Sequence, residues 1–122
     1  MGWKSVSILN PTLNCARTLE ACLASIASQD YPRELVEIII ADGGSTDGTL
    51  EVARGYTDRI YPNPLKTGEA GKAVALKHAS GELVALIDSD NILPSSDWMA
   101  RMAAPFDDPG IVAAEPIEYT YR

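Results

Sequence analysis

The sequence has no apolar segment long enough to cross a membrane or to act as a secretory signal peptide. Its first residues, MGWKSVSILNP, mix polar and apolar side chains. A myristoylation signal is also absent, because Val6 stands where that motif requires Ser or Thr after Gly2. We therefore expect a soluble, cytoplasmic protein, although a full-length polypeptide with further segments could act at the cytoplasmic face of a membrane.

Positive charge is scarce. Ten Lys and Arg residues stand against 17 Asp and Glu residues, which gives a formal net charge of −7. Such a chain would be repelled by nucleic acid and by anionic lipid, so neither is an expected partner, and some of the negative charge is available to bind a cation. The apolar content of 46% is that of a folded protein, and 122 residues suffice for a single domain.

The two cysteines and the single histidine form neither a disulfide pattern nor a zinc pattern. Cys15 and Cys22 lie seven residues apart in a predicted helix, about 10 Å along its axis, which is too far for a disulfide. Their C-x6-C spacing does not match a zinc site, so we expect two free thiols in a reducing compartment. His78, the single histidine, has no neighbouring nucleophile pattern and is interpreted as a helix residue.

Two glycine-rich phosphate-binding motifs are also missing. No G-x-G-x-x-G follows the first predicted strand, which argues against a nicotinamide-binding Rossmann domain. The segment GEAGKA at residues 68–73 lacks the G-x-x-x-x-G-K-[ST] spacing of a Walker loop. The sequence therefore offers no motif for either kind of nucleotide domain.

Short β-branched runs alternate with amphipathic segments along the chain. The runs predict strands at residues 6–10, 36–41, 58–61, 83–87 and 110–115. Helices are predicted at residues 14–29, 49–56, 72–79 and 96–103. Pro11 is expected to end the first strand, and Asn14 to cap the helix that follows it.

This alternation predicts an α/β fold, a Rossmann-like three-layer α/β/α sandwich around a mainly parallel sheet. Right-handed crossovers give the first four strands the order 3-2-1-4, with the fifth as a further strand. The order reverses between strands 1 and 4, and open α/β sheets bind ligands beyond the carboxyl ends of the strands at such a point. We therefore expect the loops after strands 1, 2 and 4 to converge on one crevice.

The acidic pair Asp88 and Asp90 follows the fourth predicted strand. In an extended segment, side chains two residues apart point the same way, so both carboxylates would enter the crevice. A hard divalent cation would remove their mutual repulsion, and Mg²⁺ or Mn²⁺ suits carboxylate together with phosphate oxygens. The alternative interpretation is an ordinary turn, since Asp, Ser and Asn are common where strands end.

Asp42 ends the second predicted strand, where nucleotide folds use an acidic residue to bind a ribose or base. The alternative for Asp42 is a turn or a helix cap within residues 42–48, and Asp47 is interpreted as a cap. Lys72 follows two glycines at a predicted helix start, where its ammonium group and the helix terminus would attract a phosphate or a sugar. A solvated surface lysine is the other interpretation of Lys72.

Nearly the whole chain resembles the family 2 glycosyltransferases with the GT-A fold. The matching segments are VSILNPTLN, the helix that ends in SQDYP, VEIIIADGGSTDGTLEVA and GEAGKAVALKHASGELVALIDSDNILPSSDW. The resemblance implies a UDP- or GDP-linked sugar donor, Mn²⁺ or Mg²⁺ as cofactor, and a sugar or lipid-linked acceptor. The implied metal ligands are Asp88 and Asp90, with Asp90 the firmer one. The implied donor-binding residues are Pro11, Thr12, Asn14, Asp42, Gly44, Lys72, Asp88 and Ser89.

Three positions depart from the family's usual pattern. Leu13 replaces a frequent Tyr and removes a stacking partner for the base, Gly43 replaces a frequent second Asp, and Lys77 replaces a frequent Asn. A complete catalytic domain of the family is also considerably longer. We therefore expect a truncated domain whose general base for inverting transfer lies beyond Arg122, so that this fragment alone is inactive.

Two other functions fit parts of the sequence. The first is a non-catalytic nucleotide-binding or self-associating module, with an apolar patch at residues 111–121 as its contact surface. The second is a phosphatase-like or nucleotidyltransferase enzyme that uses Asp88 and Asp90. Phosphatases of that type carry the motif on their first strand, whereas here it follows the fourth.

Overall fold

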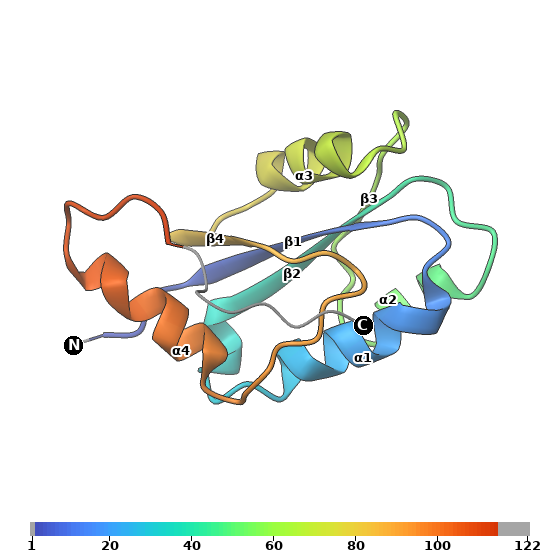
Figure 1. The fold of residues 1–122 in the computed structure, drawn as a ribbon. Coiled ribbons are helices and arrows are strands. Elements are labelled where there is room, and N and C mark those ends of the chain that lie inside the picture. The colour runs from blue at the N-terminus through green and yellow to red at the C-terminus, as the bar shows by residue number, and fades with distance from the viewer. Residues whose placement is uncertain (1, 115–122) are drawn as a thin grey trace.

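The structure, a computed structural model, describes residues 2–114. Within them, four strands alternate with four α-helices along the chain (Figure 1). Two short 3₁₀ helices, η1 Arg33–Leu35 and η2 Ala104–Asp107, precede β2 and follow α4. The other bounds are β1 Val6–Thr12, α1 Ala16–Ala27, β2 Val36–Asp42, α2 Thr49–Arg54, β3 Ile60–Pro62, α3 Gly68–Lys77, β4 Leu83–Leu86 and α4 Trp98–Ala103.

The four strands form one parallel sheet in the order β3-β2-β1-β4. β1 pairs with β2 over its whole length, and the last pair places Thr12 beside Asp42. On its other side, β1 pairs with β4 only as far as Leu9 beside Leu86. The predicted strand order is confirmed, and the loops that follow β1, β2 and β4 leave the sheet at the same end.

Helices cover both faces of the sheet, with α3 on one side and α1, α2 and α4 on the other (Figure 1). The larger core cluster, on the α1 side, contains the fully buried Ile8, Leu23 and Ile40. A smaller cluster on the α3 side joins Leu9 to Ala75. Neighbouring residues of β1 face opposite layers, and both layers are buried, so the strand carries apolar side chains on both of its faces. The predicted three-layer α/β/α architecture is confirmed.

Helix α3 begins at Gly68 rather than at Lys72, so that prediction is wrong. Thr67 is the N-cap, and its Oγ1 accepts a hydrogen bond from the backbone N–H of Ala70 at 3.1 Å. The cap lets the helix start one turn earlier, which moves Lys72 out of the first turn. The helix also lies very close to β1, since a Cβ added at Gly71 would come within 2.7 Å of the Cβ of Pro11.

Two expectations about β1 and its exit are also wrong. The strand continues through Pro11 to Thr12. The carbonyl of Leu9 accepts a hydrogen bond from the N–H of Ile87, so the backbone of Leu9 faces β4. The backbone nitrogen of Pro11, two residues later, faces the same side. The pairing with β4 has ended there, so the missing N–H of proline costs no hydrogen bond. Asn14 does not cap α1, because Cys15 is the N-cap residue and Asn14 has a left-handed backbone with φ of 48°.

The predicted fifth strand at residues 110–115 is not found. Residues 110–114 form no strand, and Glu115 lies outside the described residues. Asp108 draws this segment into a turn instead, since its side chain accepts from the N–H of Gly110 and its carbonyl from the N–H of Ile111. Most of the predicted apolar contact patch, residues 115–121, also lies outside the described part, so self-association stays a prediction. No helix within residues 2–114 is long and apolar enough to cross a bilayer.

Candidate functional site

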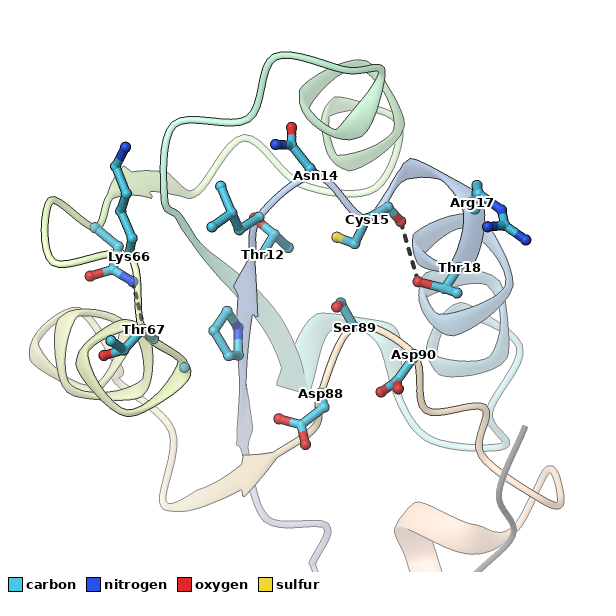
Figure 2. Close-up of a pocket in the computed structure, with 14 residues that line it drawn as sticks. Thr12, Asn14, Cys15, Arg17, Thr18, Lys66, Thr67, Asp88, Ser89 and Asp90 are labelled. Atoms are coloured by element: carbon cyan, nitrogen blue, oxygen red, sulfur yellow. Dashed lines mark hydrogen bonds between the residues drawn. The ribbon is translucent and has the colours of Figure 1, made fainter.

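A cavity of about 590 Å³ opens at the carboxyl ends of β1 and β4, between α1 and α3 (Figure 2). It lies at the reversal of strand order, as the sequence predicted. The predicted site residues that line it are Pro11, Thr12, Asn14, Asp88, Ser89 and Asp90. The predicted residues Asp42, Gly44 and Lys72 do not line it. The lining residues that sequence reasoning did not assign to a site are Leu13, Cys15, Arg17, Thr18, Asn63, Lys66, Thr67 and Gly68.

Asp88 and Asp90 lie in a tight turn rather than on an extended segment, which corrects the expected backbone. The N–H of Asn91 donates to the carbonyl of Asp88 at 3.0 Å, and the Oδ1 of Asn91 accepts from the N–H of Asp88 at 3.1 Å. The turn forms here because the pairing of β4 with β1 has ended and Asn91 supplies both bonds. In Figure 2 both carboxylates still point to the same side of the turn, toward the space between α1 and α3.

The two acids have few partners of their own. Asp88 retains 58% of its side-chain exposure, and its Oδ1 lies 3.6 Å from the Nζ of Lys72. Lys72 therefore reaches the site through Asp88, from the second turn of α3, and not as a residue at the helix start. The pair is partly solvated and contributes at most about 1 kcal/mol to stability. Such a pair leaves the carboxylate available to a stronger cation.

Asp42 is in the opposite situation, because its carboxylate is buried and saturated. It accepts bonds from the hydroxyls of Thr12 and Ser45, both at 2.7 Å, and from the backbone N–H groups of Gly44 and Ser45. Burial alone would raise the pKa of Asp42, but the bonds from Ser45, Thr12 and Gly44 outweigh it and hold the pKa below its usual value. These contacts match the turn interpretation, and Gly44 takes the positive φ of 96° that the turn requires.

The loops after β1 and β2 are fastened to each other by short hydrogen bonds. The backbone N–H of Asn14 donates to Ser45 Oγ at 2.9 Å, and Asn14 Oδ1 accepts from the N–H of Thr46 at 2.8 Å. Asp47 was interpreted as a cap, but Gly48 is the N-cap residue of α2. Asp47 is structural all the same, since its carboxylate accepts from the N–H groups of Thr49 and Ala16 at the starts of α2 and α1. Asn14 therefore joins the cavity wall to the 42–48 loop.

Two cationic side chains on the cavity wall were not predicted. Lys66 precedes the cap of α3 and has a left-handed backbone with φ of 66°, while Arg17 lies in the first turn of α1. In Figure 2 Lys66 and Arg17 lie on opposite sides of the cavity, above Asp88 and Asp90, and their side chains point away from the two acids. The sequence did contain a signal for Lys66. Thr67 is a typical N-cap residue, and its recognition would have placed the start of α3 at Gly68 and Lys66 just before the helix.

The two cysteines are free, as predicted. Cys15 lines the cavity, and Cys22 is fully buried in α1. Burial raises the pKa of Cys22 to about 12, so its sulfur stays protonated at neutral pH. It can therefore donate a weak hydrogen bond, and its Sγ lies 3.5 Å from the carbonyl oxygen of Asp88.

A parallel α/β/α sheet with a polar, acid-bearing cavity at its switch point is an architecture typical of nucleotide-binding domains. The glycosyl transferase family 2 profile matches residues 7–121. The chain belongs to this family. The match leaves the phosphatase-like and nucleotidyltransferase interpretations without support.

Relatives and solved structures agree with the assignment. The chain is 28% identical over 123 residues to the glycosyltransferase AglE of Haloferax volcanii, covering 95% of this chain and 40% of that protein. The mannosyltransferase PcManGT of Pyrobaculum calidifontis, solved with GDP-Man and Mn²⁺, superposes with a TM-score of 0.82 at 30% identity, over 91% of this chain and 34% of that one. TarS of Staphylococcus aureus, solved with UDP-GlcNAc, superposes with a TM-score of 0.75 at 30% identity, over 85% and 31%. The chain thus spans less than half of each.

Proposed function

We propose that this chain is the donor-binding part of a metal-dependent, inverting glycosyltransferase and binds a UDP- or GDP-linked sugar in the cavity beside Asp88 and Asp90. The observation that carries the proposal is the placement of both acids, with few competing partners, in a cavity of about 590 Å³ at the switch point. That volume suits a ligand of nucleotide size. Cations on the cavity wall add attraction for a diphosphate, which the chain's net charge of −7 would otherwise repel.

The residues present fit a bound Mn²⁺ or Mg²⁺. Residues 2–114 hold no group of three or more Asp, Glu, His and Cys side chains that could enclose a metal, so protein ligands alone would be few. Two carboxylates completed by diphosphate oxygens and water are the usual set for Mg²⁺ bound with a nucleotide. Asp90 would be the firmer ligand, since Asp88 already has Lys72 beside it. When bound, the ion would neutralise charge on the departing diphosphate.

The nucleoside part of the donor is proposed to lie along the loops after β1 and β2. Pro11, Thr12 and Asn14 line the cavity, and Ser89 joins them from the turn. Asp42 and Gly44 shape this wall from behind, because Asp42 holds the Thr12 hydroxyl and both loops are cross-linked. A direct contact of Asp42 or Gly44 with the donor stays a prediction, as does the contact of Lys72 with a phosphate.

Transfer of the sugar to an acceptor hydroxyl needs a general base that removes the proton of the attacking oxygen. Asp42 is not suited to this role, since four hydrogen bonds occupy its oxygens and lower its pKa, which makes it a weak base. The base and the surface for a sugar or lipid-linked acceptor are proposed to belong to a longer polypeptide, because the relatives are more than twice as long. The 122 residues alone are expected to bind a donor without transferring its sugar.

Isothermal titration of the 122-residue protein with UDP, GDP and their sugars, with and without Mn²⁺, tests the proposal. We expect measurable binding that depends on Mn²⁺ and that the variant Asp90→Ala loses. Asp58→Ala is the matched control, because Asp58 is an exposed acid that lines a separate cavity. Equal heats for wild type and Asp90→Ala would contradict the proposal.

A further inference from the structure

Asn10 is a polar side chain in a position that the fold would fill with an apolar one. It lies in the middle of β1, is fully buried, and points to the same face as Ile8, which belongs to the main core. Its Oδ1 is buried and has no hydrogen-bond partner among residues 2–114. A buried amide with an unpaired oxygen lowers stability, so core packing alone does not account for Asn10.

The other half of the Asn10 amide has a specific contact. Its Nδ2 donates to the carbonyl of Ile87 at 2.6 Å. The regular pairing of β1 with β4 ends at Leu86, and the N–H of Ile87 makes the last backbone bond, to Leu9. The Asn10 side chain therefore adds one further bond to the ladder, at the peptide that leads into Asp88.

A second buried group secures the next carbonyl. Cys22 of α1 lies 3.9 Å from the Nδ2 of Asn10, and its Sγ donates to the carbonyl of Asp88 at 3.5 Å. Two consecutive carbonyls, those of Ile87 and Asp88, are thus held from inside the core. The turn from Asp88 to Asn91 starts at this fixed point.

We propose that Asn10 is a positioning residue for the donor site: its amide fixes the peptide between Ile87 and Asp88 and thereby the direction in which Asp88 and Asp90 present their carboxylates. This inference rests on the proposed function of the two acids. The fold keeps a buried amide at a loss of stability because the acids must lie in register with the cavity. Groups that hold metal ligands in place contribute to affinity without touching the ligand themselves.

Asn10→Leu in the 122-residue protein separates this role from a structural one. The variant removes both the bond to Ile87 and the unpaired oxygen. We expect its Mn²⁺-dependent affinity for UDP or GDP to fall about tenfold or more. Because the variant removes the unpaired oxygen but also leaves the Ile87 carbonyl without its donor, its melting temperature should stay within about 4 °C of the wild-type value. Asn10→Val, which adds less bulk, is made alongside and should behave in the same way if Leu proves too large for the core.

Ser7→Ala is the matched control. Ser7 is also fully buried in β1, but it faces the other layer, where it bonds Glu37 and Gly81. We expect Ser7→Ala to lower the melting temperature and to leave the affinity unchanged. A loss of affinity without a loss of melting temperature in Asn10→Leu, together with the reverse in Ser7→Ala, would support a positioning role for Asn10.

The outcomes are distinguishable. If wild-type protein binds nucleotide with Mn²⁺ and both Asn10 variants bind equally well, the positioning role is wrong and the proposed function stands. If both variants lose affinity only in proportion to a lower melting temperature, Asn10 is structural and the inference is again wrong. If wild-type protein shows no Mn²⁺-dependent binding, the proposed function fails and the inference fails with it.

Discussion

The loop after β2 and the turn after β4 both carry acids at the same end of the sheet, yet they are built in opposite ways. In the loop, Asp42 is 7% exposed and its carboxylate accepts four hydrogen bonds. In the turn, Asp88 and Asp90 are exposed, and the lysine beside Asp88 is at the distance of a loose ion pair. Hydrogen bonds within the protein therefore stabilise the charge of Asp42, whereas the charges of Asp88 and Asp90 lack comparable partners.

The difference separates an acid that shapes the cavity wall from two acids whose carboxylates remain available to a ligand. Saturated hydrogen bonds stabilise the folded loop and hold Thr12 and Asn14 in the cavity wall. Unsatisfied neighbouring carboxylates repel each other and gain most from an added cation. Substitutions in the loop should therefore change stability, and substitutions in the turn should change binding.

The largest effect is expected for Asp90→Asn. The substitution removes a proposed metal ligand, so the Mn²⁺-dependent affinity for UDP or GDP should fall at least about 100-fold, which is about 2.7 kcal/mol. The free energy of unfolding, measured in urea, should change by less than about 0.5 kcal/mol because the side chain is exposed. Asp58→Asn carries the same charge change away from the cavity and should bind as wild type does.

Asp42→Asn should produce the reverse pattern. In the variant, an amide NH₂ group replaces a carboxylate oxygen that accepts hydrogen bonds in the wild-type protein, so some of these donors lose their acceptor. We therefore expect the free energy of unfolding to fall by about 1–3 kcal/mol. Urea unfolding measures the loss. Affinity measured well below the unfolding transition should change less than in Asp90→Asn. A variant as stable as wild type would show that the four bonds contribute little.

Acid stability follows from the lowered pKa of Asp42. In the unfolded chain this carboxyl has a pKa of about 3.9, and in the folded protein its pKa is lower. Its stabilising contribution is therefore complete above about pH 4 and is lost as the pH falls through the folded pKa. Unfolding free energies measured between pH 7 and pH 3 should fall less steeply at the acid end in Asp42→Asn than in wild type. Parallel curves would contradict this assignment.

The smallest effect is expected for Lys72→Met. Stability should change by less than about 1 kcal/mol, because the pair with Asp88 is partly solvated. The affinity of the variant for the nucleotide diphosphate should be only a few-fold lower than that of the wild-type protein. Added salt should weaken binding by the variant less than binding by the wild-type protein, because the variant lacks a charge that salt screens. Titration at low and high salt measures both. Unchanged affinity at low salt would identify Lys72 as a surface lysine.

Much of this arrangement could be predicted from the sequence. Alternating apolar runs and amphipathic segments predict the order 3-2-1-4, and polar residues directly after apolar strands place Asp42 and Asp88 at one end of the sheet. The spacing of Asp88 and Asp90 predicted that both carboxylates lie on one side of the turn, and their binding of a metal ion stays a prediction. The backbone of the turn was not predictable, because it depends on where β4 stops pairing with β1.

Other features depended on contacts that no local pattern records. Lys66 lies in the cavity wall because Thr67 caps α3. The same cap explains why α3 begins at Gly68 and not at Lys72, the start predicted from the sequence. In the sequence Asn10 is one more residue of a predicted strand. Its proposed role rests on the hydrogen bond from its side chain to the carbonyl of Ile87, which only the structure reveals. The apolar run from residue 110 forms no strand over residues 110–114, where Asp108 holds the start of the segment in a turn.

Paramagnetic broadening by Mn²⁺ tests the central claim most directly. Sub-stoichiometric Mn²⁺ is added to ¹⁵N-labelled 122-residue protein with UDP or GDP, and backbone amide signals are followed. We expect the signals of residues 88–91 and of Thr12 to broaden first, while residues 56–59, which lie on the second cavity, stay sharp. Asp90→Asn should abolish the selective broadening. Broadening centred away from the 88–91 turn, or unchanged in Asp90→Asn, would contradict the account.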